Sequence, residues 1–255
     1  MLRLLFKNLE SYKIYSLSTE KVLHKLNEGT YVFKLIKKCP SHLILLATSA
    51  GDQEPNYFIK LYQPRLFKRN RVKDFKHNLH VLRRLGIPHF QPLLIIYQVP
   101  LRAIISGENF YAGIVYYHLS KGFLNKDDFL GNINQGYKLI QNLVQFLYSL
   151  HQNKVLLRDT KYNNFYYQPL EGIKIFDIDG IKFLNREPSL GERLRDLAPL
   201  AMSLEWIGFR EAKKIIFTEY QKVYSYLPEE TFVFFSNIVS ERKRKREYKN
   251  LLSEK

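Results

Sequence analysis

The stretch from Val155 to Asp179, VLLRDTKYNNFYYQPLEGIKIFDID, constrains the chain more than any other part of the sequence. Its pattern predicts a short β segment, a polar loop and a hairpin that turns at Glu171 and Gly172. The polar residues that do not suit strand interiors are Asp159, Lys161, Asn164, Asp177 and Asp179. Carboxylate and amide oxygens at strand ends are suitable ligands for Mg²⁺, and a nearby lysine suits anionic oxygens. The stretch therefore predicts the chemistry of phosphoryl transfer.

The overall composition predicts a folded globular protein with an anionic partner. The chain has 255 residues, of which 45% are hydrophobic and 15% aromatic, and this composition argues against disorder. The formal net charge of +16 indicates nucleic acid, a phospholipid surface or a phosphorylated substrate as the partner. The single cysteine, Cys39, excludes an internal disulfide framework and a set of cysteine ligands for zinc. A reducing compartment is the simpler expectation.

No apolar run in the sequence has the length of a membrane-spanning helix. The first residues are interrupted by Lys7 and Glu10, which leaves too short a run for a signal-peptide core. The most apolar later region, Pro92 to Ile105, is broken by Pro100 and Arg102. We expect a protein that is soluble or peripherally bound to a membrane.

The segment from Thr30 to Tyr62 predicts an antiparallel sheet. Three apolar runs, TYVFKLIK, HLILLA and YFIKLY, are separated by short turns. In the third run Lys60 shares a face with Phe58 and Tyr62. The strand pattern alone favours an exposed lysine at this position, because lysine is rarely buried.

A basic segment after this sheet predicts a helix that ends at Gly86 and Pro88. Its apolar residues at helical spacing are Phe75, Leu79, Leu82 and Leu85. Asp74 is its only acidic residue. The basic side chains predict either a solvated helix face or a patch for an anionic substrate or phospholipid surface, and both alternatives stay open.

The composition becomes helical after Gly122. Gln135 to Gln152 carries an apolar stripe formed by Leu139, Leu143, Phe146, Leu147 and Leu150. Further helical patterns are RLRDLAPLAMSLEWIG, EAKKIIFTEYQKVYSYL and EETFVFFSNIV, and the basic run ERKRKREYK is typical of a solvated or frayed end. Asp196, in the first of these patterns, either hydrogen-bonds the polar loop or faces water. We expect an α+β protein with a β-rich lobe over 1–118, a helical lobe over 119–240 and a basic tail over 241–255.

The spacing of the polar residues is typical of a kinase catalytic loop. Such a loop has the form H-R-D-L-x-x-x-N and is followed by a metal-binding D-F-G. Arg158, Asp159 and Asn164 stand in the R, D and N places, and FDID supplies Asp177. The chemistry needs a carboxylate that accepts the proton of the attacking hydroxyl, and an amide and a carboxylate that hold Mg²⁺ against phosphates. Lys60 stands upstream where the V-A-I-K lysine would lie.

The chain resembles the protein-kinase-like superfamily and, within it, the bacterial lipopolysaccharide core sugar kinases that act on 3-deoxy-D-manno-octulosonic acid or heptose. The likeness rests on FIKLY, a helix ending LRRLGIP, RDTKYNNFYY followed by FDID, and RLRDLAPLAMSL. It extends from about Thr30 to Trp206. The resemblance implies a two-lobed fold, with an antiparallel sheet and one helix in the N-terminal lobe. It also implies ATP and Mg²⁺ as cofactors, and a core glycolipid as acceptor at the cytoplasmic face of the bacterial inner membrane.

The same resemblance implies the roles of individual residues. Asp159 would be the catalytic base, and Lys161 would reach the γ-phosphate. Asn164 and Asp177 would bind magnesium, and Asp179 would assist the metal or the substrate, or lie on the surface. Lys60 would hold the α- and β-phosphates. The connection that meets adenine through its backbone would be formed by Tyr116, Tyr117, His118 and Leu119.

The sequence departs from the family pattern at four places. No G-x-G-x-x-G precedes Lys60, so another loop, around Cys39 to His42, would have to cover the phosphates. Leu157 replaces the usual histidine, and no A-P-E segment follows Asp179. Asp74 is the only acid near the place of the helix glutamate that pairs with the lysine.

These departures leave two other functions open. One is a protein kinase or small-molecule kinase of the same superfamily. The other is a pseudokinase or nucleic-acid-binding module that uses the basic helix and tail. The set of metal ligands argues for an active enzyme, and nucleic acid is the less favoured partner.

Overall fold

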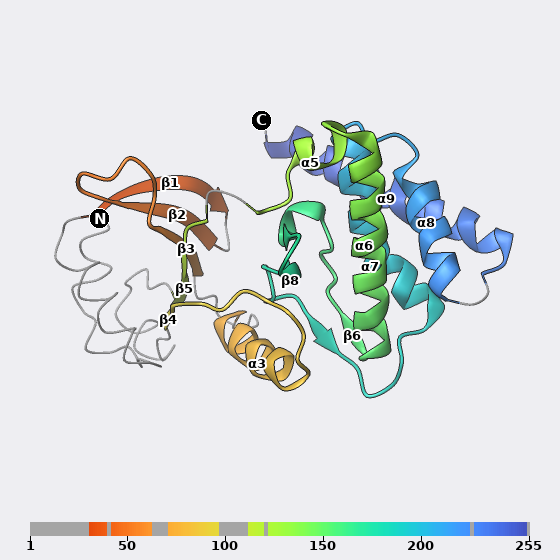
Figure 1. Ribbon diagram of the computed structural model, residues 1–255, viewed down its shortest axis with the longest axis horizontal. Coiled ribbons are helices and arrows are strands. Elements are labelled where there is room, and N and C mark those ends of the chain that lie inside the picture. The colour runs from red at the N-terminus through yellow and green to blue at the C-terminus, as the bar shows by residue number, and fades with distance from the viewer. Residues whose placement is uncertain are drawn as a thin grey trace. The chain divides into compact units, whose positions relative to one another are not determined.

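The computed structural model describes residues 31–39, 42–62, 71–96, 112–119, 122–224 and 227–253 (Figure 1). The first 30 residues of the predicted β-rich lobe, and the centre of the turn between Cys39 and His42, lie outside these ranges. The chain divides into two compact units, Met1–His80 with Phe90–Ser120 and Val81–His89 with Lys121–Lys255. The lobe boundary placed at residues 118 and 119 stays a prediction.

The first unit is built on an antiparallel sheet, as the sequence predicts, and the sheet has five strands. Its strands lie in the order β1-β2-β3-β5-β4. Their bounds are β1 (Tyr31–Cys39), β2 (His42–Ser49), β3 (Tyr57–Tyr62), β4 (Leu94–Ile96) and β5 (Ala112–Tyr117). Strands β1, β2 and β3 follow one another through short turns, and each can bury one face against a common core.

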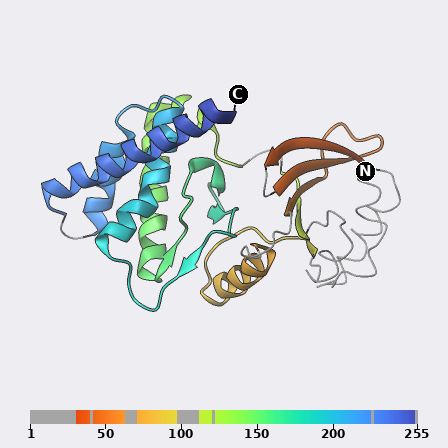
Figure 2. The same ribbon diagram turned by 180° about the vertical axis from the view of Figure 1, so that it is seen from behind.

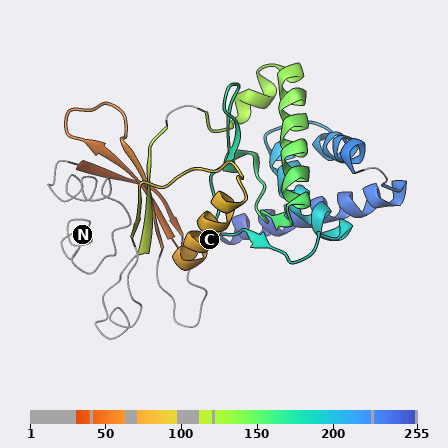
Figure 3. The same ribbon diagram turned by 60° about the horizontal axis from the view of Figure 1, so that its bottom comes forward.

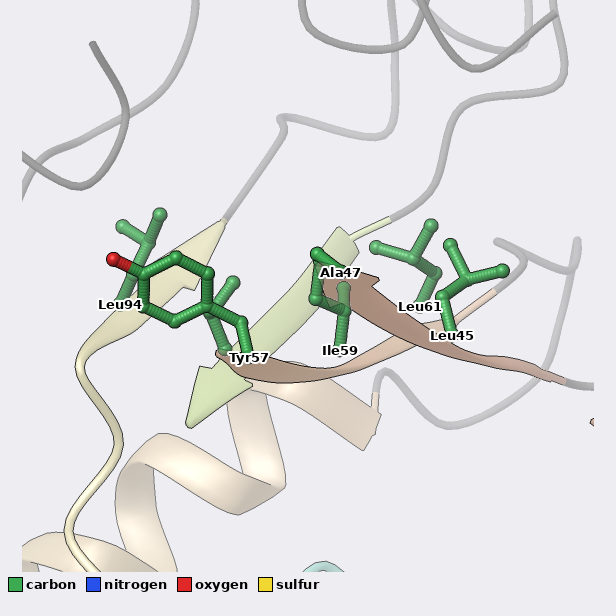
Figure 4. Close-up of a cluster of buried hydrophobic side chains, with 7 residues drawn as sticks. Leu45, Ala47, Tyr57, Ile59, Leu61 and Leu94 are labelled. Carbon is green, nitrogen blue, oxygen red and sulfur yellow. The ribbon is translucent and has the colours of Figure 1, made fainter. Parts of the chain in front are cut away.

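One face of the sheet carries a tight apolar cluster. Ile59 of β3 lies between Leu45 of β2 and Val115 of β5 in the strand register, and Ile59 and Val115 are fully buried. Figure 4 shows the side chains of the cluster rising from the same side of the sheet. Its members are Leu45, Ala47, Tyr57, Ile59, Leu61, Leu94 and Val115.

Helix α3 (Arg71–Arg84) packs on the other face of the sheet (Figure 3). The ring of Phe75 contacts Tyr116 of β5 edge-on, with 6.4 Å between centroids. Leu79 and Leu82 are buried, whereas Leu85 lies beyond the helix end and is 39% exposed. Gly86 has φ +66°, the left-handed conformation that ends many helices and favours glycine. The predicted helix and its end are therefore confirmed, but Leu85 does not belong to the buried stripe.

The second unit is mainly helical, so the α+β class is confirmed. Its helices are α5 (Lys126–Leu130), α6 (Ile133–Gln152), α7 (Leu190–Trp206), α8 (Ala212–Val223) and α9 (Glu229–Ser253). In α6 the predicted residues Leu139, Leu143, Leu147 and Leu150 are buried. Helix α9 lies across α7 and α8, as Figure 2 shows.

Helix α9 continues through the basic run that the sequence pattern assigned to a frayed end. It extends unbroken to Ser253. Lysine, arginine and glutamate are strong helix formers, and Glu241 pairs with Lys245 one turn later at 2.5 Å. None of the described helices is both long enough and apolar enough to cross a membrane.

Two short strand pairs position the polar loop of the second unit. Strand β6 (Val155–Leu156) pairs with β9 (Lys182–Phe183), and β7 (Phe165–Gln168) pairs with β8 (Gly172–Ile175). Gly172, at φ +74°, starts β8 after the tight connection, so the predicted hairpin is confirmed.

Candidate active site

The strand pairs of the second unit bring two polar segments together. Residues 157–164 connect β6 to β7, and residues 176–181 connect β8 to β9. Because β6 pairs with β9 and β7 pairs with β8, the start of each segment lies beside the end of the other. The backbone N–H of Phe176 donates to the carbonyl oxygen of Asn164 at 3.0 Å. Asp177 is therefore only one residue away from this backbone hydrogen bond to Asn164.

Asp159 and Lys161 form an ion pair on the first of these segments. Nζ of Lys161 lies 2.8 Å from each carboxylate oxygen of Asp159. The Asp159 side chain is 50% exposed, so an acceptor hydroxyl can reach it from solvent. The ion pair places the Lys161 ammonium group directly beside this exposed carboxylate.

Asn164 is oriented by a hydrogen bond to the same segment. Its Nδ2 donates to the carbonyl oxygen of Asp159 at 2.8 Å, and this contact identifies the other amide atom, Oδ1, as the oxygen available to a cation. Asp177 is half-buried and supplies a carboxylate from the adjacent segment. Two hard oxygen ligands of this kind fit Mg²⁺.

A complete protein cage for a metal is not found in the part of the chain that the structure describes. No group of three or more His, Cys, Asp or Glu side chains is placed to hold an ion there.

Asp196 of α7 accepts hydrogen bonds from the first residues of the loop that connects β6 to β7. Its buried carboxylate accepts hydrogen bonds from the backbone N–H groups of Leu157 (3.0 Å) and Arg158. The hydroxyl of Thr160 donates to the Asp196 carbonyl oxygen. Of the two roles that the sequence left open for Asp196, the structure shows hydrogen bonding to the loop.

These contacts fix a strained backbone directly before Asp159. Arg158 has φ +69°, in the left-handed region that costs a non-glycine residue about 1–2 kcal/mol. The Asp196 carboxylate offsets this cost because it satisfies two backbone donors that the turn would otherwise bury without partners.

A buried network extends from Asp196 into α8. His151 Nε2 lies 3.2 Å from the Asp196 carboxylate, and its Nδ1 lies 2.8 Å from the hydroxyl of Tyr220. Burial raises the pKa of Tyr220, so its hydroxyl stays protonated. The sequence analysis missed this network. The available signal was His151 itself, which follows Leu147 by four residues on the apolar stripe of α6.

A second charged network surrounds the start of α7. Arg193 is 2% exposed and pairs with Glu187 at 2.7 Å, while its Nε donates to the Pro188 carbonyl oxygen at 2.8 Å. Its guanidinium lies over the ring of Tyr224, 5.0 Å from the centroid. A buried arginine with these partners fixes the chain between β9 and α7.

In the first unit Lys60 is buried, which corrects the expectation of an exposed strand lysine. It is 8% exposed and lies between Ile44 and Ile114 in the strand register. Its Nζ lies over the ring of Tyr62, 5.2 Å from the centroid. Lysine is rarely buried, so the location of Lys60 at the centre of the sheet marks it as a functional candidate.

The segment predicted to contact adenine covers the end of β5. Tyr116 is buried against Phe75, whereas Tyr117 is 60% exposed and stacks on Tyr57 at 5.9 Å. The N–H of His118 donates to the carbonyl oxygen of Asn56 at 2.8 Å, so this amide is engaged in the sheet. Leu119 lies beyond the strand and is half-buried.

The predicted partner of Lys60 lies at the start of the helix on the same face of the sheet. Asp74 is half-buried in the first turn of α3 and precedes Phe75. A pair between Asp74 and Lys60 stays a prediction. The structure thus brings together Asp159, Lys161, Asn164 and the Asp177 segment in the second unit, and places Lys60 and Tyr116 in the first.

Comparison with known proteins adds no family to this geometry. No protein-family model matches the chain, and no curated protein matches its sequence significantly.

Proposed function

We propose that this protein is a Mg²⁺-dependent kinase of the protein-kinase-like superfamily, which transfers the γ-phosphate of ATP to an alcohol. The acceptor that the sequence resemblance favours is a sugar hydroxyl, of 3-deoxy-D-manno-octulosonic acid or heptose, in the inner core of lipopolysaccharide. The observation that carries the proposal is the loop with Asp159, Lys161 and Asn164, which is held by Asp196 beside the Asp177 segment.

In this proposal each side chain has one task. Asp159 orients the acceptor hydroxyl and accepts its proton as the oxygen attacks phosphorus. Lys161 balances the charge of Asp159 before the reaction and contacts the transferred phosphoryl group during it. Asn164 and Asp177 would hold Mg²⁺, which supplies charge neutralisation for the phosphates when bound. Lys60 is assigned to the α- and β-phosphates.

The buried network supports the proposal because it positions Asp159 without depending on a ligand. A general base must lie within hydrogen-bond reach of the proton it accepts, and small displacements reduce the rate strongly. The hydrogen bonds from Leu157 and Arg158 to Asp196 fix the backbone on the N-terminal side of Asp159. The hydrogen bond from Asn164 to the Asp159 carbonyl oxygen fixes it on the other side.

The decisive experiment is phosphoryl transfer by purified protein. Incubation with ATP, Mg²⁺ and a lipopolysaccharide core glycolipid should add one phosphate to the lipid, as measured by mass spectrometry. We expect Asp159→Asn to reduce transfer by about 100-fold or more, because the base is lost while the shape is kept. Equal transfer by wild type and Asp159→Asn would refute the proposal.

A panel of acceptors separates the two steps of the proposal. Transfer to a protein or a small alcohol, but not to the glycolipid, would retain the kinase and reject the sugar acceptor. Nucleotide binding that ignores Mg²⁺, with no transfer to any acceptor, would instead favour a pseudokinase.

A further inference from the structure

Strand β1 contains a bulge that decides which of its lysines share a face with Lys60. The pairing of β1 with β2 is regular from Tyr31 to Leu35, which pairs with Leu45, and resumes with Lys37 opposite Ile44. Ile36 is therefore the extra residue of the bulge. In a regular strand Leu35 and Lys37 would point to the same side, whereas the bulge directs them to opposite sides.

The strand register places Lys37 and Lys60 in one row across the sheet. Lys37 pairs with Ile44, and Ile44 pairs with Lys60. Directly paired residues project from the same face, so the two lysines flank Ile44 on the face that α3 also covers. Two strand spacings separate their backbones by about 10 Å. Two long lysine side chains can span that distance to contact one chain of phosphates.

Lys38 projects from the opposite face. It pairs with Leu43, which packs against the apolar cluster that contains Leu45 and Ile59. Lys37 and Lys38 are both exposed neighbours with the same charge, and they differ in the face that they occupy. They therefore form a matched pair for experiment.

The charge of Lys60 is directed toward the end of the sheet where Lys37 lies. Its Nζ lies over Tyr62, whose ring contacts His42 at the start of β2. His42 pairs with Cys39, two residues after Lys37. None of the five strands contains an aspartate or glutamate.

We propose that Lys37 binds the phosphates of the nucleotide together with Lys60, and replaces with its side chain the backbone amides that a glycine-rich loop would supply. This inference rests on the proposed function. The regular pairing of β1 with β2 persists to Cys39 and His42, and this end of β1 contains no glycine. An ammonium group on a bulged strand supplies the positive charge that phosphate oxygens need.

The test is a titration of the full chain with ATP in the presence of Mg²⁺, followed by calorimetry, and a parallel titration with adenosine, which lacks phosphates. For Lys37→Ala we expect the Kd for ATP to rise about tenfold and the Kd for adenosine to stay unchanged. Lys38→Ala, which removes the same charge from the other face, should change the Kd for ATP less than twofold. Lys37→Arg should retain most of the affinity.

Each result has a distinct meaning. If Lys37→Ala and Lys38→Ala raise the Kd for ATP equally, general charge explains the effect and the proposal is wrong. If the wild type binds ATP and transfers phosphate while Lys37→Ala binds ATP unchanged, the role of Lys37 is refuted and the kinase is retained. If the wild type binds no ATP, the proposed function itself is overturned together with this inference.

Discussion

A single carboxylate, that of Asp196, determines the shape of the loop that carries Asp159. It accepts hydrogen bonds from the N–H groups of Leu157 and Arg158 and contacts the ring of His151. An ionised carboxylate can accept all three at once, whereas an amide of the same size offers one oxygen and presents its NH₂ group to a donor. The charge of Asp196 is therefore as important as its size.

We expect Asp196→Asn to lower the free energy of unfolding by about 2–3 kcal/mol, because at least one buried backbone donor loses its partner. The left-handed backbone at Arg158 should open first, since its strain is no longer offset. Urea denaturation measures the stability. Amide hydrogen exchange measures the loop, where the protection of Leu157 and Arg158 should fall more than that of α6.

The control for this substitution is Glu247→Gln, which makes the same chemical change at an exposed position of α9. Its stability should stay within about 0.5 kcal/mol of wild type. Unchanged exchange at Leu157 and Arg158 in Asp196→Asn would show that the loop keeps its shape without the carboxylate.

At the scale of elements, the start of α7 is fixed by reciprocal capping. The Ser189 hydroxyl accepts from the N–H of Glu192, and the Glu192 carboxylate accepts from the N–H of Ser189 at 2.8 Å. Arg186 donates to both oxygens of the same carboxylate. The hydrogen bond from Arg186, with that from the Ser189 N–H, lowers the pKa of Glu192 to about 2. Helix α7 also carries Asp196, so the cap at its start supports the loop that Asp196 holds.

The pKa of Glu192 predicts a defined pH dependence. A carboxyl whose folded pKa is depressed adds stability above its unfolded pKa of about 4.5, and this contribution is lost as the pH falls toward the folded value of about 2. We therefore expect Glu192→Gln to lower the Tm at pH 7, and the difference from wild type to be nearly constant down to about pH 5.5. Below about pH 4.5 the two melting curves should converge.

Thermal unfolding of both proteins from pH 7 to pH 3 measures this convergence. Arg186→Gln should behave in the same way, because it removes the main cause of the shift. A difference in Tm that stays constant to pH 3 would contradict the role of the carboxylate charge.

Elements that depend on local pattern could be predicted from the sequence. Alternating apolar residues gave the strands of the first unit, and Gly172 marked the hairpin. The burial of Lys60, the bulge at Ile36 and the network around His151 could not be predicted in this way. Each depends on a partner distant in the chain, such as Asp196, 45 residues from His151. Periodicity reports which face is apolar, but it does not report which buried polar groups meet.

The proximity of the segments that carry the candidate site residues could be predicted from local pattern, whereas the residues that support these segments could not. Asp159 and Asn164 precede one hairpin and Asp177 follows it, so the strand pairing alone brings their segments together. The residues that fix the loop come from three helices, and no spacing in the sequence connects them.

At the scale of the molecule, basic side chains are concentrated in the second half of α9. The first half of this helix buries Phe235 and Val239, and its later residues Arg244 and Arg246 are exposed. The segment 241–255 carries seven basic and three acidic residues. Helix α9, which ends at Ser253, holds its basic side chains at fixed spacing, so they can contact an anionic surface together with little loss of chain entropy.

We expect the double variant Arg244→Gln with Arg246→Gln to bind vesicles that contain phosphatidylglycerol about 10–30-fold more weakly than wild type, since each basic residue near such a surface contributes about 1 kcal/mol. Neutralising two exposed basic residues near the start of α8, Arg210 and Lys214, removes the same charge elsewhere and should have a smaller effect. Co-sedimentation at low and high salt measures both, and the difference between the variants should vanish at high salt because the charges are screened. Equal weakening by the two pairs would assign membrane binding to net charge, and no weakening by either would reject a membrane role for α9.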